Sequence, residues 1–228
     1  MTPLRRQAAR LGLAAMMLTL TSACRPDAGA SDYASQEPFG AEGSGDGGPT
    51  NALAGPDPWT PGEDRLSIGA FYEGGSSDLV PIDDATTHLY VYENTLRLQP
   101  VTTRVEGLEA TAIEHAGGPW WGCGVHWDLA RDMGAWTTLH VSLRSDVAAF
   151  AELELGMNDA DGTYTVQAST YGWAPDDTWH HLAIPLTDFD DAGLSRDRVT
   201  AVLVLLGGPG ANGDPLLIDN VYFTAAAP

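Results

Sequence analysis

The chain contains no lysine: all 11 of its basic residues are arginines, against 31 aspartates and glutamates in 228 residues. The formal net charge of −20 argues against nucleic acid as a partner, because phosphate binding requires a positive surface. Only two cysteines occur, Cys24 and Cys123, so disulfide bonds cannot be the main support of the fold. The sequence also has no serine nucleophile elbow, phosphate-binding loop, dinucleotide fingerprint or zinc-type histidine pair.

The N-terminus lacks an apolar run long enough to cross a bilayer. Arg5, Arg6 and Arg10 precede the short apolar run 11–20, and small residues then lead to Cys24. This pattern predicts a secretory signal peptide over residues 1–23. It also resembles a bacterial lipobox, which implies that Cys24 is the first mature residue and is acylated, for example with palmitate. An ordinary signal peptide with an incidental Cys24 is the alternative.

Residues 24–63 consist mainly of Gly, Ala, Pro, Ser and Asp, with hardly any apolar periodicity. Such a segment cannot bury enough apolar surface to repay the entropy of folding, so it is predicted to be a disordered tether. Together with the lipid, the tether would hold one domain, residues 64–225, off a membrane in the cell envelope. That domain would face the periplasm or the cell exterior. A monomer is expected.

Short alternating runs separated by Gly, Asp and Asn turns fill the rest of the chain. In residues 137–144 the alternation puts Leu139, Val141 and Leu143 inward, and residues 151–157 and 164–168 follow the same period. Residues 158–162 are typical of a hairpin turn between two of these strands. With no clear helix, the pattern predicts an all-β fold, an antiparallel two-sheet β-sandwich or jelly roll.

The last strand, residues 216–223, is apolar on both faces and is therefore predicted to be central in its sheet. The simple alternation puts Leu217, Val221 and Phe223 on the face of Asp219, and Leu216 and Ile218 on the other. A carboxylate among apolar neighbours is costly without a partner, so Asp219 is expected to be hydrogen-bonded, paired or bound to a metal.

This ending carries a resemblance. Together with the strand pattern from Trp179 to Phe189 and the apolar run 199–206, it resembles the end of jelly-roll carbohydrate-binding modules of the galactose-binding-like superfamily. The resemblance implies non-catalytic recognition of a polysaccharide or glycan. It also implies a structural Ca²⁺ held by Asp219, with Glu73 as a second ligand.

Candidate sugar contacts follow from the outward positions and the aromatic residues. Arg144, Gln167 and Trp173 are expected to share one exposed sheet face, where planar polar groups and an indole could bind a pyranose. The glycine-rich stretch 117–127 contributes three further indoles, one or two of which are expected in the core: Trp120, Trp121 and Trp127.

Two alternatives remain open. Glu152 and Glu154, two residues apart on one predicted strand, would project from the same face about 7 Å apart, a spacing within the range of glycosidase carboxylate pairs. A jelly-roll glycoside hydrolase or polysaccharide lyase would use them. The second alternative is an envelope scaffold or adhesion module with a protein partner, which an exposed apolar patch would favour.

Overall fold

The computed structural model describes residues 65–69, 71, 78–80, 82–83, 85–105 and 107–225. Cys24, Glu73, the signal peptide and the tether lie outside these residues. Within the described part of the chain, no helix is long and apolar enough to cross a membrane.

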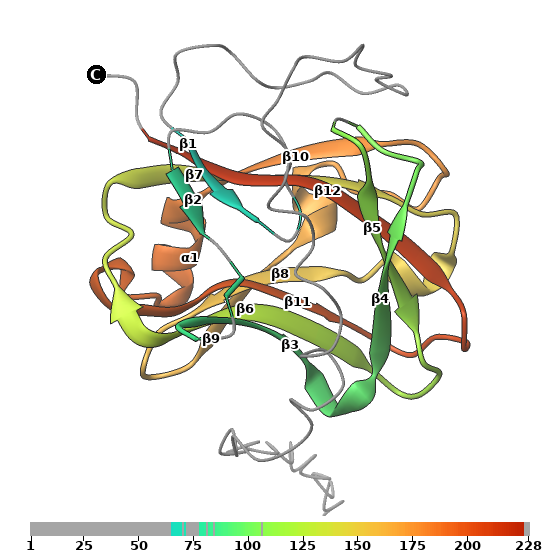
Figure 1. The fold of residues 1–228 in the computed structure, drawn as a ribbon, viewed down its shortest axis with the longest axis horizontal. Coiled ribbons are helices and arrows are strands. Elements are labelled where there is room, and N and C mark those ends of the chain that lie inside the picture. The colour runs from blue at the N-terminus through green and yellow to red at the C-terminus, as the bar shows by residue number, and fades with distance from the viewer. Residues whose placement is uncertain are drawn as a thin grey trace, which may run out of the picture.

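Two β-sheets face each other across the core (Figure 1). Sheet A has seven strands in the order β10, β7, β12, β1, β2, with β5 pairing the first half of β12 and β4 pairing β5. Its strands are β1 (Arg65–Ile68), β2 (Asp78–Val80), β4 (Leu96–Val101), β5 (Ala110–His115), β7 (Trp136–Arg144), β10 (His180–Pro185) and β12 (Pro215–Ala225). Sheet B has the order β3, β6, β11, β8, β9. Its strands are β3 (Thr87–Val91), β6 (Trp121–Arg131), β8 (Glu154–Asn158), β9 (Thr163–Gln167) and β11 (Val199–Gly207).

Apolar side chains from both sheets fill the space between them. Leu139, Val141 and Leu143 of β7 are fully buried, as the alternation predicts, and they share one core with Val125 of β6 and Leu155 of β8. All strand pairs are antiparallel except β1 with β2. The predicted two-sheet sandwich is therefore confirmed.

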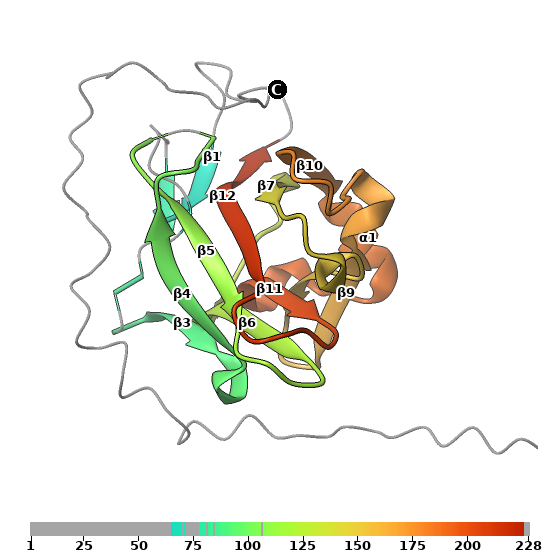
Figure 2. The same ribbon diagram turned by 90° about the vertical axis from the view of Figure 1, so that its right-hand side faces the viewer.

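One α-helix interrupts the predicted all-strand pattern. The segment from Trp179 to Phe189 divides into β10 and α1 (Leu186–Ala192), and α1 packs beside β7, β9 and β10 at one side of the sandwich (Figure 2). Leu186 and Phe189, three residues apart, are its buried residues, and Gly193 ends it in the left-handed conformation. Short 3-10 turns occur at η1 (Tyr92–Asn94), η2 (Ala148–Phe150), η3 (Ala168–Tyr171) and η4 (Arg196–Arg198).

β12 is the central strand of sheet A, as predicted, but its two faces differ from the simple alternation. Asn220 has a φ of 54°, and the pairing with β7 shifts register between Asp219 and Tyr222. This irregularity places Leu216, Ile218, Val221 and Phe223 together in the core. The face assignment from strict alternation was wrong, because one residue in the left-handed conformation reverses the parity beyond it.

Candidate functional site

The outward face of sheet B carries two adjoining hollows. The larger, of about 470 Å³, is lined by Glu152, Glu154, Gln167, Leu206, Gly207 and Gly208. The smaller, of about 150 Å³, crosses the sheet and is lined by Tyr92, His126, Asn158, Thr163, Val204 and Leu206. Leu206 lines both, so the hollows are neighbours, and we call them together the sheet B groove.

Glycines keep the floor of the sheet B groove low. Gly122 and Gly124 alternate with the buried Trp121, Cys123 and Val125, so their missing side chains belong to the outward face. A Cβ atom on Gly122 would lie 2.7 Å from Cδ2 of Tyr92 and 2.8 Å from Cδ2 of Leu206. The glycines therefore let the Tyr92 ring lie close over β6.

Aromatic rings form one side of the groove. The Tyr92 hydroxyl lies 2.7 Å from Nε2 of His126, and their ring centroids are 5.9 Å apart. Tyr90 is 39% exposed and packs at 5.4 Å from the rings of both His88 and His126. Burial, with a smaller contribution from His88, lowers the pKa of His126 to about 4, so the His126 ring is uncharged at neutral pH.

Carboxylates and an amide form the other side. Gln167 donates from Nε2 to Oε1 of Glu154 over 2.7 Å, and these two residues are direct partners in the pairing of β8 with β9. Glu152 is exposed at the rim, in the turn that precedes β8. It therefore shares the hollow with Glu154, although the two do not occupy one strand as expected.

Asn158 lines the smaller hollow and has an acceptor without a partner beneath the surface. Its side-chain Oδ1 is buried and has no hydrogen-bond partner among the described residues. A buried polar atom without a partner carries a free-energy cost of about 1–3 kcal/mol. Because this oxygen is not exposed, a ligand hydroxyl in the hollow could bond to it only after the Asn158 amide turned outward.

The indole of Trp173 does not lie on the exposed face as expected. It is 4% exposed, belongs to the main core, and donates from Nε1 to the carbonyl oxygen of Phe150 over 2.7 Å. The sequence departs from strand geometry after Gln167, because residues 168–171 form η3, and the parity that placed Trp173 outward ends there. The expected exposure of Trp173 was wrong.

The tryptophan-rich stretch is a strand and not a binding loop. Trp121 and Trp127 are buried on the core side of β6, at 0% and 6% exposure. Trp120 is half-buried and precedes Trp121, which pairs with Gly207 at the end of sheet B that holds the larger hollow. Of the three indoles, only Trp120 therefore remains a candidate ligand contact.

Arg144 lies on the other sheet. β7 belongs to sheet A, whereas β8 and β9 belong to sheet B, because the chain crosses between the sheets through η2. The guanidinium group of Arg144 binds the carboxylate of Asp177 at 3.0 Å. The expected shared face of Arg144 and Gln167 was wrong.

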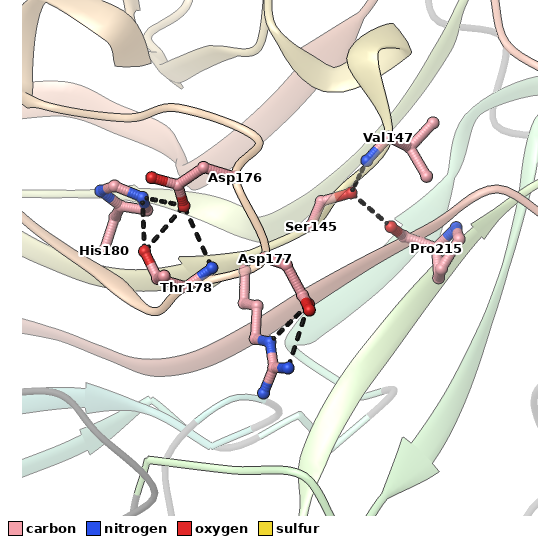
Figure 3. A network of polar contacts seen from close by, with 8 residues as sticks. Ser145, Val147, Asp176, Asp177, Thr178, His180 and Pro215 are labelled. Atoms are coloured by element: carbon pink, nitrogen blue, oxygen red, sulfur yellow. Dashed lines mark hydrogen bonds and ion pairs between the residues drawn. The ribbon is translucent and has the colours of Figure 1, made fainter.

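A polar cluster next to Arg144 superficially resembles a catalytic triad. Asp176, Thr178 and His180 lie together at the start of β10 (Figure 3). However, Oδ1 of Asp176 and the hydroxyl of Thr178 both contact the same ring atom, Nε2 of His180, at 2.8 and 3.1 Å. A triad requires the two ring nitrogens to have different partners, so this cluster organises a turn.

The partner that the sequence demands for Asp219 is the backbone. Its Oδ2 accepts from the N–H of Val105 over 2.7 Å, and its Oδ1 accepts from the N–H of Asn220 over 2.8 Å. Asp219 thereby fastens the segment around Val105 to β12. No group of three or more His, Cys, Asp or Glu side chains that could hold a metal gathers within the described part of the chain. Glu73 lies outside the described residues.

Sequence reasoning placed Gln167 on an outward face, where the structure also has it, and missed the aromatic side of the groove. Tyr90 and Tyr92 come from the consecutive elements β3 and η1, whereas His126 comes from β6, more distant in sequence. The alternation of glycine with large residues in 121–127 was the available signal, because it marks a strand with one bare face.

Comparisons with known proteins identify the family. Residues 68–225 match the family model described as Carbohydrate binding domain 30. A search of curated proteins returns no match.

Solved structures with a similar fold include the family 30 carbohydrate-binding module of a cellulosomal cellulase of Clostridium thermocellum, with 18% identity, 61% of this chain and 87% of that chain covered, and a TM-score of 0.47. Another is the family 11 module from Clostridium thermocellum in complex with a β-1,3-1,4-mixed-linked tetrasaccharide, with 14% identity, coverage of 62% and 90%, and a TM-score of 0.46. A β-1,2-glucanase from Parabacteroides distasonis matches with 16% identity over 62% of this chain and 23% of its own, with a TM-score of 0.44.

The assignment rests on the family model, which spans more than half of the chain and nearly all of the described sandwich. The chain therefore belongs to the family of Carbohydrate binding domain 30 and is a non-catalytic carbohydrate-binding module.

Proposed function

We propose that the module binds an extended oligosaccharide in the sheet B groove. The observation that carries the proposal is the pairing of aromatic rings on one side with carboxylate and amide groups on the other, over a floor of glycines. Aromatic planes pack against the apolar faces of pyranose rings, and planar polar groups bond to their hydroxyls. In this proposal the sugar packs on Tyr92 and bonds to Asn158, Glu154 and Gln167.

An open groove accommodates the middle of a polysaccharide better than its end. The two hollows lie side by side on the outward face of sheet B and share Leu206. A β-linked glucan has flat rings with equatorial hydroxyls, which would let successive sugars lie over Tyr92, Leu206 and Gln167. We therefore take β-glucans as the first ligands to test.

Isothermal titration calorimetry against neutral β-glucan oligosaccharides tests the site. Gln167→Ala should weaken binding about three- to tenfold, because it removes about one net hydrogen bond. Tyr92→Ala should weaken it at least about tenfold, since it removes the aromatic surface as well.

The matched control lies in sheet A. Gln99 of β4 donates to Glu114 of β5, so Gln99→Ala removes the same kind of Gln–Glu pair from the opposite sheet. It should leave affinity unchanged. Equal affinities for Gln167→Ala, Tyr92→Ala and the unmodified protein would refute this placement of the site. Chromatography of the titrated sugar also checks for cleavage near Glu152 and Glu154.

A protein-binding scaffold is less well supported. The exposed large hydrophobic residues of the described chain are Tyr90, Leu108 and Leu129, which come from three different segments. They are the kind of isolated surface hydrophobic residues found on most soluble domains.

Anchoring and calcium extend the proposal beyond the groove. A lipid on Cys24 and a tether over residues 24–63 would place the module, as a monomer, at the surface of the cell envelope. The lipobox-like residues before Cys24 support this. A calcium ion at Asp219 stays a prediction from the family resemblance. A rise in melting temperature with Ca²⁺ that Asp219→Asn abolishes would support it.

A further inference from the structure

The charge of the sheet B groove is unevenly distributed. Glu152 and Glu154 line the larger hollow, and its other lining residues, Gln167, Leu206, Gly207 and Gly208, are uncharged. The smaller hollow has only neutral lining residues at pH 7, because burial keeps the His126 ring unprotonated. The groove is thus acidic at one end and neutral at the other.

No described arginine compensates this charge, because none lines either hollow. Each has an identified contact elsewhere: Arg65 over Tyr222, Arg97 with Asn212, Arg104 with two backbone carbonyls, Arg131 over Trp127, Arg144 with Asp177, Arg196 with Asp190 and Arg198 with Asp161. Lysine does not occur in the chain. The cation that would neutralise the two carboxylates must therefore come from outside the groove.

The carboxylates also retain capacity to bind. Each carboxylate can accept about four hydrogen bonds, and Gln167 occupies one such position on Oε1 of Glu154. Glu152 is exposed at the rim of the same hollow. An ammonium group placed between them would gain charge-assisted hydrogen bonds, whereas a carboxylate or sulfate there would meet two like charges.

We propose, resting on the function proposed above, that the Glu152 and Glu154 end of the groove is a subsite for an amino sugar with a free ammonium group. The same charges exclude glycans that carry uronic acid or sulfate groups. Acidic residues alone would not support this assignment. It depends on their position in a hollow of about 470 Å³ on a module whose family establishes carbohydrate as the ligand.

Three β-1,4-linked tetrasaccharides that share one backbone test the proposal by calorimetry at pH 6 with the full-length protein. They are cellotetraose, which is neutral, the glucosamine tetramer, which is cationic at C2, and the glucuronic acid tetramer, which is anionic at C6. We expect the glucosamine tetramer to bind about tenfold more tightly than cellotetraose, and the glucuronic acid tetramer about tenfold more weakly. The N-acetylglucosamine tetramer, substituted at C2 without charge, should show no such gain.

The double variant Glu152→Gln with Glu154→Gln keeps the shape of the side chains and removes both charges. Because Glu154 is itself a proposed sugar contact, the readout is the ratio of the three affinities and not their level. The double variant should bring them to within about threefold of one another. Glu114→Gln in sheet A is the matched control, and it should preserve the tenfold differences.

The outcomes separate this inference from the proposed function. Equal binding of the three tetramers by the unmodified protein, or charge preferences that persist in the double variant, would overturn the amino-sugar subsite alone. Binding of cellotetraose that Tyr92→Ala leaves unchanged would overturn the sheet B groove as the site. Failure of all three tetramers to bind would overturn both.

Discussion

A buried hydrogen bond explains why the chain has tryptophan at position 173. The indole N–H of Trp173 bonds to the carbonyl of Phe150, which joins η2 to the end of η3 across the edge of the core. Trp173→Phe would leave that carbonyl without its donor and the core with a small cavity. We expect a loss of about 2–4 kcal/mol in the free energy of unfolding, with unchanged affinity for oligosaccharides.

Chemical denaturation and calorimetry on the same Trp173→Phe sample measure the two effects. Tyr90→Ala, at an exposed ring beside the groove, should show the opposite pattern, with weaker binding and little change in stability. A Trp173→Phe variant of full stability but reduced affinity would mean that the indole contacts the ligand after all.

His140 should make stability depend on pH. Its ring stacks on Tyr222 at 4.6 Å and lies 3.1 Å from His181, and burial, with His181 and Arg65 nearby, lowers its pKa to about 3. Between pH 6.5 and 3, His140 therefore binds a proton in the unfolded chain but not in the folded chain. Stability should fall as the pH falls through this window, by about 1.4 kcal/mol per pH unit for this histidine.

Urea denaturation at pH 4.5, 5.5 and 6.5 measures that dependence. His140→Gln should make the decline shallower by about one proton, while the contributions of the carboxylates and of His126 remain in both proteins. Parallel stability curves for the variant and the unmodified protein would contradict the low pKa of His140.

At the scale of single elements, the left-handed residue in β12 controls which side chains enter the core. Asn220, with φ of 54°, separates Ile218 from Val221, and both are fully buried in one core. Glycine adopts this conformation freely, alanine at a cost of about 1 kcal/mol, and a β-branched residue at a higher cost. We expect stability to decrease in the order Asn220→Gly, Asn220→Ala, Asn220→Val.

Thermal and urea denaturation of the three Asn220 variants give that order directly. Since glycine and alanine both remove the amide side chain, their difference of about 1 kcal/mol isolates the backbone effect. Equal stability of Asn220→Gly and Asn220→Ala would show that the left-handed conformation does not constrain this position.

The elements with regular alternation were predictable from sequence, and those with special backbone geometry were not. β7 has a strict period of two with bulky inward residues, so its faces are correct. In β6, Gly122 and Gly124 alternate with buried residues, and such glycines are also typical of a loop. The start of α1 follows Pro185 without any side-chain cap, although Gly193 beyond its end was a visible stop signal.

At the scale of the whole molecule, the site depends on a crossing that local patterns do not encode. β7 and β8 are neighbours in sequence but belong to different sheets, so Arg144 and Gln167 end on different sheets of the sandwich. In contrast, the hairpin of β8 and β9 is local and was predicted from its turn, and it makes Glu154 and Gln167 direct partners. Pairings between distant strands, such as β3 with β6, brought in the aromatic side that sequence reasoning missed.

The proposed anchor and the module should act independently, because all residues that line the groove lie between Tyr92 and Gly208. In a bacterial host, the unmodified chain should partition into the detergent phase of a Triton X-114 extract. Cys24→Ala should shift it to the aqueous phase, since an acyl chain contributes about 0.8 kcal/mol of membrane binding per buried CH₂ group. Both proteins should bind a soluble oligosaccharide with equal affinity.

Cys123→Ala, at the buried thiol of β6, is the control for loss of a cysteine and should leave partitioning unchanged. If Cys24→Ala stayed in the detergent phase, the anchor would have to lie elsewhere in the chain.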